Sequence, residues 1–368
     1  MSRFAACLRC ALLPLLFWHA FAGAAPAPAA WAYIGWWLPD SWRQAPLNRL
    51  DRLLFFELKV GANGSISQRN GWPEQWSALR TAARSNGVAL DLTLTVLDAA
   101  TFEQLFSSKQ ACARLLDEAT ALARHADVAG LQIDMEVYTP LPAATIVNFQ
   151  RFIHELSQRL RGLTPARKLS VFFPMGAASP YYDKATLAQV DYVVLQGYDA
   201  HWTESARAGP VAPLAGPEAV TWEKALAAGL ALGVPKPKML FSFPFYGYEW
   251  PVMDAQARSA TTGPATQISY APLPEGLVPA LRVNALEQAR RYGARHELPS
   301  ASAWYRYRNK DGAHVQGWFE DRGSLTRKAN WVERNQVGGI AFFVLGYDRS
   351  ELLRHHVRHR PARAPATP

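Results

Sequence analysis

Eight short apolar segments with the composition of buried β-strands constrain the fold of this chain more than any other feature. They cover residues 31–38, 52–60, 88–96, 128–134, 168–174, 192–197, 238–245 and 337–345. Helical patterns over residues 76–86, 101–125, 143–160 and 219–232 separate several of them. Strands that alternate with helices pair in parallel through right-handed crossovers, so the sequence predicts an α/β protein with a (β/α)8 TIM barrel. A doubly wound sheet is the alternative, but no glycine-rich phosphate loop follows the first segment.

The interval between the seventh and eighth segments is too long for one helical crossover. Residues 283–292 have a helical pattern there, and residues 302–308 and 314–319 have the composition of strands. We therefore expect a small α+β insertion at about 255–317, above one wall of the cleft. No repeat or linker divides the chain, which predicts one barrel domain over residues 26–350 and a basic flexible tail over residues 351–368.

The first 25 residues are typical of a secretory signal peptide. Arg3 and Arg9 supply positive charge, residues 11–21 are apolar, and residues 22–24 are small residues of the kind that precede a cleavage site. An uncleaved anchor is the alternative, although the apolar run is short for a transmembrane helix. We expect a secreted or periplasmic protein that has no further contact with a membrane.

The remaining composition narrows the class of protein. Of the three cysteines, only Cys112 lies beyond the predicted signal peptide, so no intrachain disulfide is expected after cleavage. The net charge of +9 suits an anionic polysaccharide, and a merely solvated basic surface explains it equally well. The chain has no metal-ligand spacing and no nucleic-acid motif. We expect no cofactor, no metal and no nucleic-acid partner, and we expect a monomer.

The segment Ala129–Glu136 ends in two acids, Asp134 and Glu136. Alternate residues of a strand point to the same face, so the two carboxyl groups should lie side by side at the end of the fourth strand. Barrel enzymes place their chemistry at this end of their strands. Like-charge coupling and hydrogen bonding to Asp134 would raise the pKa of Glu136, which favours Glu136 as a general acid. A structural salt bridge, or a pair in which Asp134 is the nucleophile, is the alternative.

Two later strand ends add polar and aromatic side chains. Gln196, Tyr198 and Asp199 end the sixth strand, and Tyr246 follows the seventh. A tyrosine at a strand end often has only a packing role. The strand ends of one barrel nevertheless converge on one mouth, so we expect these four side chains to join the two acids.

Three further residues are candidates for contact with a substrate. Trp36 follows the first strand, Glu57 lies near the end of the second, and Trp318 lies in the expected insertion. Core packing explains the two tryptophans equally well, and a structural salt bridge explains Glu57.

Together these motifs resemble family 18 of the glycoside hydrolases, the chitinase-like enzymes. Ala129–Glu136 is similar to the DGxDxDxE signature of that family, and residues 196–199 are similar to its sixth-strand M-x-Y-D motif. Residues 245–250 resemble the Y-G-Y-[DE]-W motif of the spore-cortex-lytic, peptidoglycan-acting branch, and residues 314–328 resemble its WFED…S…K segment. The resemblance covers about residues 31–350 and implies the TIM barrel as well.

The resemblance also implies an activity and a mechanism. It implies a glycosidase that cleaves β-linked N-acetylglucosamine-containing glycans, such as peptidoglycan or chitin, through an oxazolinium intermediate that the substrate's own acetamido group forms. Glu136 would protonate the glycosidic oxygen and later serve as the base for water. Asp134 would orient and stabilise the acetamido nitrogen, and Tyr198 would hydrogen-bond the acetamido oxygen. Asp199 and Tyr246 would contact the sugar.

The chain departs from the family pattern at four positions. Ala129 and Gln132 replace two aspartates of the signature, Gln196 replaces the sixth-strand Met, and Phe343 replaces the eighth-strand Trp that floors the sugar pocket. Gln132, Gln196 and Phe343 are expected to contact substrate in their place, and the Phe343 ring offers a smaller stacking face. Two alternatives therefore stay open: a non-catalytic glycan-binding protein of the chitinase-like lectin type, and an enzyme that processes an N-acetylated envelope exopolysaccharide.

Overall fold

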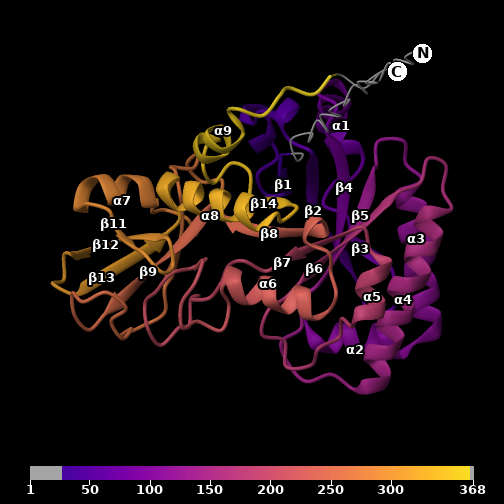
Figure 1. The fold of residues 1–368 in the computed structure, drawn as a ribbon, viewed down its shortest axis with the longest axis horizontal. Helices are drawn as coiled ribbons and strands as arrows, with labels where there is room; N and C mark the ends of the chain where they lie inside the picture. The colour runs from indigo at the N-terminus through magenta and orange to yellow at the C-terminus, as the bar shows by residue number, and fades with distance from the viewer. Residues whose placement is uncertain (1–26, 365–368) are drawn as a thin grey trace, which may run out of the picture.

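Eight parallel strands close into a barrel in the computed structural model, which describes residues 27–364 (Figure 1). The strand order is β1-β14-β8-β7-β6-β5-β4-β2, and pairing of β1 with β2 closes the barrel. The strands are β1 (Ala29–Gly35), β2 (Arg52–Val60), β4 (Ala89–Val96), β5 (Gly130–Met135), β6 (Lys168–Phe173), β7 (Tyr192–Leu195), β8 (Met239–Pro244) and β14 (Gly339–Phe343). The TIM-barrel prediction is confirmed. The predicted signal peptide lies outside the described residues.

Helices cover the outside of the barrel, with α3 and α4 at the right of Figure 1. They are α1 (Ser77–Ser85), α2 (Ala99–Ser107), α3 (Lys109–Ala123), α4 (Ala143–Arg161), α5 (Lys184–Gln189), α6 (Trp222–Ala231) and α8 (Arg322–Asn335), with 3-10 turns at Ser41–Gln44, Leu47–Arg49, Glu74–Trp76 and Lys236–Lys238. In α4, Phe149, Ile153 and Leu156 recur at intervals of three and four and are fully buried against the barrel. Within residues 27–364, every helix falls short of the length or apolar character that crossing a bilayer requires.

The region predicted as one or two helices over residues 101–125 is two helices because Ser108 ends the first and caps the second. Its backbone is extended, with φ of −105° and ψ of 113°, and its hydroxyl accepts a hydrogen bond from the amide of Ala111. Asp98 caps α2 in the same way through the amide of Thr101. Such caps satisfy amide groups that have no partner within the helix.

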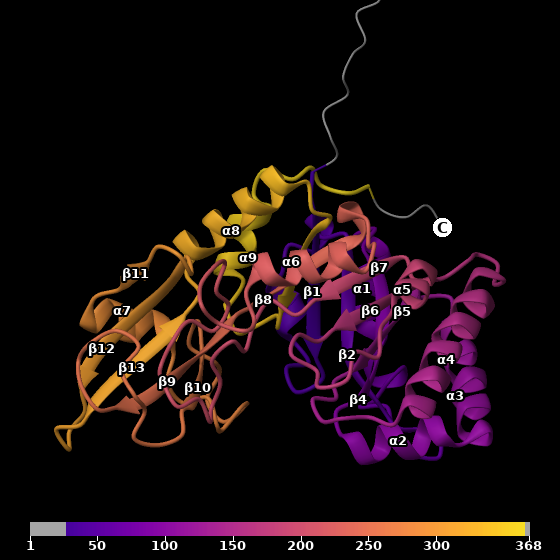
Figure 2. The same ribbon diagram turned by 60° about the horizontal axis from the view of Figure 1, so that its bottom comes forward.

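An α+β insertion lies beside the barrel, at the left of Figures 1 and 2. Its antiparallel sheet has the strand order β10-β9-β13-β12-β11. The elements are β9 (Tyr246–Val252), β10 (Thr266–Ser269), α7 (Ala285–Tyr292), β11 (Arg295–Glu297), β12 (Ser302–Arg308) and β13 (His314–Phe319). The insertion begins earlier than the predicted residue 255, because the aromatic segment after β8 continues directly into β9 and pairs with β10 and β13. A further short strand, β3 (Ile66–Gln68), pairs antiparallel with β2.

A buried ion pair joins the insertion to α8. The Lys328 amino group lies 2.6 Å from the Glu320 carboxylate, and both side chains are completely buried. Ser302 of β12 donates a hydrogen bond of 2.6 Å to the other oxygen of Glu320. A buried charge is tolerated only when it is paired and hydrogen-bonded, so this cluster ties β12, the end of β13 and α8 to one another.

The prediction of a flexible tail from residue 351 is wrong for the part that the structure describes. Residues 351–357 form helix α9 (Glu351–Val357), whose Leu352, Leu353 and Val357 are buried in the core. After α9, Arg360 and Arg363 both form ion pairs with Asp51, the latter at 2.9 Å. The basic side chains that indicated a solvated tail instead bind the last described residues to the barrel.

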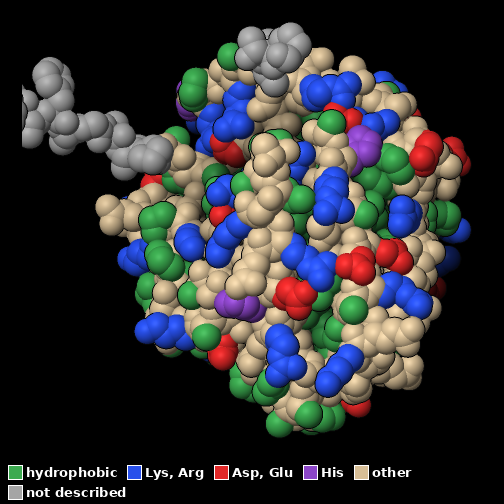
Figure 3. All heavy atoms as spheres, turned by 90° about the vertical axis from the view of Figure 1, so that its right-hand side faces the viewer, with side chains coloured by type: hydrophobic (Ala, Val, Ile, Leu, Met, Phe, Trp, Pro, Cys, Tyr) green, Lys and Arg blue, Asp and Glu red, His purple; other side chains and the backbone are tan. Residues whose placement is uncertain are grey.

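The face formed by α3 and α4 mixes the two signs of charge (Figure 3). Lys and Arg side chains are interspersed there with Asp and Glu, and Arg159 pairs with Asp117 at 2.7 Å and with Glu155 at 2.8 Å. The basic excess of the sequence is therefore not gathered into a single stripe on this face.

Candidate active site

Asp134 and Glu136 lie at the carboxyl end of β5, as the sequence predicted. Asp134 pairs with Thr95 of β4, and the amide of Glu136 donates a hydrogen bond of 2.9 Å to Val96 of the same strand. These contacts continue the extended backbone to Glu136, so that both side chains emerge on one face. Asp134 is 3% exposed, whereas Glu136 is half-buried.

Burial raises the pKa of both carboxyl groups. The pKa of Asp134 lies well above its ordinary value because the group is desolvated and because Glu136 and Glu57 are negatively charged neighbours. The pKa of Glu136 rises to about 7, mainly through burial and further through Asp199 and Glu57, while a hydrogen bond from Tyr138 lowers it. A carboxyl group with a pKa near 7 can both donate and accept a proton at neutral pH, which a general acid–base requires.

The partners of these acids rule out the salt-bridge alternative. No basic side chain within residues 27–364 is among the groups that shift the pKa of Asp134 or Glu136. Asp134 Oδ1 is buried and has no hydrogen-bond partner among the described residues. The expected hydrogen bond between Asp134 and Glu136 is therefore not supported at Oδ1, and Glu136 Oε2 instead accepts a hydrogen bond of 2.7 Å from Tyr138. A buried, unpaired carboxylate oxygen is a ready acceptor for a donor on a ligand.

Glu57 and Gln132 are buried residues close to the two acids. The Glu57 carboxylate accepts a hydrogen bond of 2.7 Å from Thr95 and lies 3.6 Å from the Lys59 amino group. The contact with Lys59 is the structural salt bridge that was the alternative to a role in substrate binding. Gln132 is completely buried, and its oxygen accepts a hydrogen bond of 3.3 Å from Thr93. Gln132 precedes Asp134 by two residues on β5 and has no exposed surface, so contact between Gln132 and a substrate stays a prediction.

Asp199 lies at the mouth with two tyrosines from β9. It accepts hydrogen bonds from the hydroxyl groups of Tyr246, at 2.8 Å, and Tyr248, at 3.4 Å. Its φ of +60° places it in the left-handed region, which an aspartate tolerates better than most residues. Burial raises the pKa of Asp199 to about 6, and the two hydrogen bonds oppose that rise.

Tyr198 and Phe343 belong to an aromatic cluster at the same mouth. Tyr198 is 9% exposed and packs edge-on against Tyr246, with 5.8 Å between ring centroids. Phe343 is half-buried at the end of β14, so part of its ring stays open to solvent. The rings of Tyr33, Trp37, Phe56, Tyr198 and Tyr246 surround it, with centroid separations of 5.3–6.5 Å.

Trp36 and Trp318 have different outcomes. Trp36 is 39% exposed beyond β1, and its ring lies edge-on to Trp37 at 5.9 Å, so it is accessible to a ligand at the mouth. Trp318 is completely buried in the insertion, where it stacks on Trp304 at 5.4 Å. The prediction that Trp318 lines the cleft is wrong, because its position on β13 turns the ring into the interior of the insertion.

Sequence reasoning missed Tyr138. Its hydroxyl lies between Glu136 and Gln196, whose oxygen is 3.4 Å away. Gln196 is buried and also accepts a hydrogen bond of 2.6 Å from the amide of Met175. Tyr138 lies in the loop after β5, where the two-residue period of a strand no longer says where a side chain points. Its position two residues after Glu136 was the one available signal.

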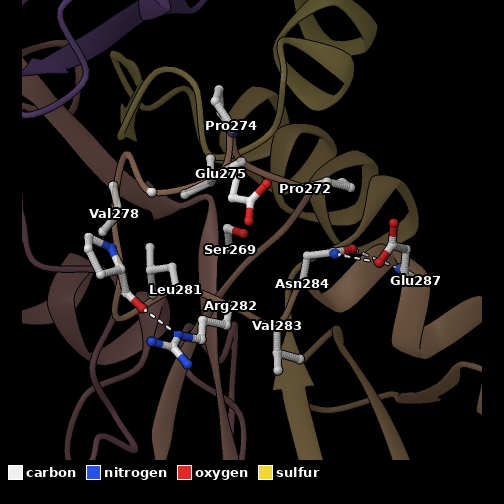
Figure 4. A pocket seen from close by; sticks show the side chains of 13 residues that line it. Ser269, Pro272, Pro274, Glu275, Val278, Leu281, Arg282, Val283, Asn284 and Glu287 are labelled. Atoms are coloured by element: carbon white, nitrogen blue, oxygen red, sulfur yellow. Dashed lines mark hydrogen bonds between the residues drawn. The ribbon is translucent and has the colours of Figure 1, made fainter.

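A sizeable cavity lies away from Asp134 and Glu136. It has a volume of about 640 Å³ and is lined by residues of the segment 269–287 in the insertion (Figure 4). Its polar groups are largely bonded to one another: Asn284 pairs with Glu287 at 2.8 Å, and Arg282 donates to the carbonyl of Pro279 at 3.2 Å. Within residues 27–364, no group of three His, Cys, Asp or Glu side chains could hold a metal ion.

The chain matches known proteins over most of its length. The model of the glycosyl hydrolases family 18 matches residues 38–348. A cortical fragment-lytic enzyme of Bacillus subtilis is 26% identical over 301 residues, which cover 78% of this chain and 64% of that enzyme. The chain thus spans less than two thirds of that curated relative.

Two solved structures have the same fold. A GH18 chitinase from Cycas revoluta, in a complex with allosamidin, superimposes with a TM-score of 0.72 at 20% identity and covers 89% of this chain and 98% of that chain. The spore cortex-lytic enzyme SleL of Bacillus cereus gives a TM-score of 0.70 at 19% identity, with 90% of this chain and 74% of that chain covered.

Proposed function

The chain belongs to family 18 of the glycosyl hydrolases, and on this premise we propose that it cleaves β-linked N-acetylglucosamine-containing glycans, as in peptidoglycan or chitin. The observation that carries the proposal is the pair on β5: Glu136, whose pKa is about 7, beside Asp134, which has a buried oxygen without a partner among residues 27–364. The chain's relatives include a cortical fragment-lytic enzyme, which is consistent with a cell-wall glycan.

Glu136 protonates the glycosidic oxygen, and the 2-acetamido oxygen of the substrate attacks the anomeric carbon. The bond to the leaving group breaks as an oxazolinium ring forms, which inverts the anomeric carbon. The later attack of water inverts it again, so the anomeric configuration is retained overall. Asp134 accepts a hydrogen bond from the acetamido nitrogen as positive charge develops there, and Tyr198 donates one to the acetamido oxygen. Water then opens the ring, and Glu136 takes its proton.

The placement of the two acids favours this mechanism over one with Asp134 as the nucleophile. A nucleophile and an acid must flank the sugar on opposite sides, with about 5–5.5 Å between their carboxyl groups. Asp134 and Glu136 emerge from one strand on one face, so a sugar ring cannot lie between them. The substrate must therefore supply the nucleophile, which makes an N-acetyl group at the cleaved sugar a requirement.

The test is hydrolysis by purified protein of N-acetylated chitooligosaccharides and of peptidoglycan, with products identified by mass spectrometry. Glu136→Gln should lower turnover by about 10²–10⁴-fold, the usual contribution of proton transfer. Glu155→Gln is a matched control, because Glu155 is exposed on α4 and pairs with Arg159 far from the mouth. Full activity of Glu136→Gln would refute the assignment.

Acetylation of the substrate tests the mechanism separately. Oligosaccharides that carry a free amine at the cleaved sugar should be resistant, and a thiazoline analogue of the oxazolinium ion should inhibit. Equal cleavage of the acetylated and the deacetylated substrates would exclude the acetamido group as the nucleophile and leave the glycosidase assignment standing.

A non-catalytic glycan-binding protein is the second candidate, and the absence of signature aspartates at Ala129 and Gln132 favours it. Calorimetric binding of N-acetylglucosamine oligomers without turnover on any substrate would support it. An N-acetylated exopolysaccharide belongs in the same substrate panel, because its cleavage in preference to peptidoglycan would identify an envelope-processing enzyme.

We also propose that the protein is exported and that the barrel and its insertion, predicted over residues 26–350, form one catalytic domain that α9 extends. The positive charge, apolar run and small residues of the first 25 residues support export. Sequencing the amino terminus of the protein recovered from the periplasm or medium tests cleavage of the signal.

A further inference from the structure

Tyr138 contacts the general acid from outside the barrel. Its ring is 45% exposed, and its hydroxyl donates a hydrogen bond of 2.7 Å to Glu136 Oε2. The second acceptor, Gln196 Oε1, is 3.4 Å away, which is long for a hydrogen bond of this kind. A phenol has one proton to donate, so the shorter contact with Glu136 is the stronger of the two.

The loops around Tyr138 are tied to one another. Gln196 Oε1 accepts from the amide of Met175, at 2.6 Å, in the loop after β6. In the same pair of loops, the amide of Leu141 donates to Ser179 at 2.9 Å, and the Tyr181 hydroxyl donates to the carbonyl of Met135 at 2.5 Å. These bonds hold the segment between β5 and α4 against its neighbour, so Tyr138 rests on an ordered support although its ring faces solvent.

The contact distinguishes the two oxygens of Glu136. Oε2 already accepts the hydrogen bond from the Tyr138 hydroxyl. An oxygen that accepts a strong hydrogen bond is a less favourable site for the carboxyl proton than the other oxygen. We propose that Tyr138 is a positioning residue, which keeps the acidic proton of Glu136 on Oε1 and limits the pH range over which Glu136 carries it. This inference rests on the proposed glycosidase function, because it assigns a purpose to the orientation of the acid.

The other groups that face Glu136 act in the opposite direction. Asp134 on its own strand, Glu57 on β2 and Asp199 after β7 are carboxyl groups. The nearby phenols of Tyr33, Tyr181 and Tyr198 are neutral, since burial raises the pKa of each above its ordinary value.

No basic side chain within residues 27–364 is among the groups that shift the pKa of Glu136. Burial and two carboxylates raise that pKa to about 7, and the Tyr138 hydrogen bond opposes them by stabilising the ionised form. Removing the hydroxyl should therefore raise the pKa of Glu136.

Tyr138→Phe removes the hydroxyl and keeps the ring, and its exposed site makes misfolding unexpected. The first measurement is the titration of Glu136 in the free protein, followed by NMR of ¹³C-labelled glutamate side chains and assigned with Glu136→Gln. The titration midpoint should rise by about one pH unit, because the free energy of a hydrogen bond to a charged group commonly corresponds to a pKa shift of that size. Tyr307→Phe is the matched control, since it removes a hydroxyl in the insertion and should leave the titration unchanged.

The second measurement is the pH profile of hydrolysis. In Tyr138→Phe the alkaline limb of kcat/KM should move upward with the NMR titration. At the pH optimum, kcat should fall about tenfold on oligosaccharides, whose poor leaving groups need a well-oriented acid. It should fall less on aryl glycosides, whose leaving groups depart with little protonation, and KM should change little on either substrate.

The two measurements separate this inference from the proposed function. An unchanged Glu136 titration in Tyr138→Phe would overturn the inference, whatever the activity. An equal loss of kcat on both kinds of substrate would also overturn it, because a merely structural defect does not depend on the leaving group. A raised titration midpoint in a protein that hydrolyses none of the substrates would uphold the control of the proton by Tyr138 and count against the glycosidase function.

Discussion

Replacing Lys328 by methionine tests how much the buried ion pair stabilises the junction between the insertion and α8. The Lys328 amino group lies 2.6 Å from Glu320 and 3.2 Å from the carbonyl of Ala301, with no exposed surface on either side chain of the pair. Methionine fills a similar volume but leaves the Glu320 carboxylate with Ser302 as its remaining side-chain donor. Removing one partner of a buried pair costs about 3–5 kcal/mol, because the other charge stays buried and uncompensated.

The assay is chemical denaturation at two pH values. Burial raises the pKa of Glu320 to about 7 even beside Lys328, and loss of Lys328 should raise it further. The lone carboxyl group of native Lys328→Met should therefore hold a proton that the unfolded chain loses as the pH rises from 5.5 to 8. The variant should therefore lose less stability at pH 5.5 than at pH 8. Amide hydrogen exchange should accelerate first in β12 and β13, because the pair anchors those strands.

Two variants complete the design. Arg159→Met removes two surface ion pairs, with Asp117 and Glu155, and should cost about 1 kcal/mol. Combining Lys328→Met with Glu320→Leu replaces both charges by apolar groups and should recover much of the lost stability. If Lys328→Met unfolds at the same denaturant concentration as Arg159→Met, Glu320 is not held as a buried charge and the reasoning fails.

Two further predictions concern the active site. Glu136→Gln should flatten the pH dependence of stability. Burial raises the pKa of Glu136 from 4.5 to about 7, so between these pH values the native state keeps a proton that the unfolded chain loses. Wild-type stability therefore falls as the pH rises from 4.5 to 7, and the variant lacks this fall. Denaturation at pH 4 and pH 8 checks this, and parallel curves for the two proteins would contradict it. Phe343→Trp should strengthen binding of N-acetylglucosamine oligomers by about 0.5–1.5 kcal/mol through its larger stacking face. Calorimetry in a Glu136→Gln background measures the change, and weaker binding would mean that the larger ring disrupts the surrounding cluster.

The barrel was predictable because the same sequence pattern, an apolar segment of strand length, occurs eight times along the chain. Each of the eight apolar segments overlaps a strand of the closed sheet, and a helical pattern such as that of α4 indicates a buried face directly. The position of Asp134 and Glu136 at the mouth followed from two rules that need no long-range contact. Alternate strand residues share a face, and barrel strands open their carboxyl ends on one side.

Residues outside these periodic elements were harder to place. Gln132 shares the face of Asp134, but its distance from the mouth depends on how deep each layer of the barrel lies, and it is completely buried. Trp318 is on a strand of the expected composition, yet whether its ring meets the cleft or the interior depends on how the insertion sheet packs. Tyr138 lies in a loop, where no period orients a side chain.

The sequence by itself determined the barrel, the two acids at its mouth and the family, because these depend on local periodicity and on short motifs. The tertiary structure decided which side chains the acids meet. Tyr138 reaches Glu136 from the following loop, and Gln196 accepts a hydrogen bond from the amide of Met175 in the loop after β6. It also turned the basic end of the chain into an anchor, because Asp51, more than 300 residues earlier, lies within reach of Arg360 and Arg363 only after the barrel closes. Such contacts join segments far apart in the chain, and no local pattern records them.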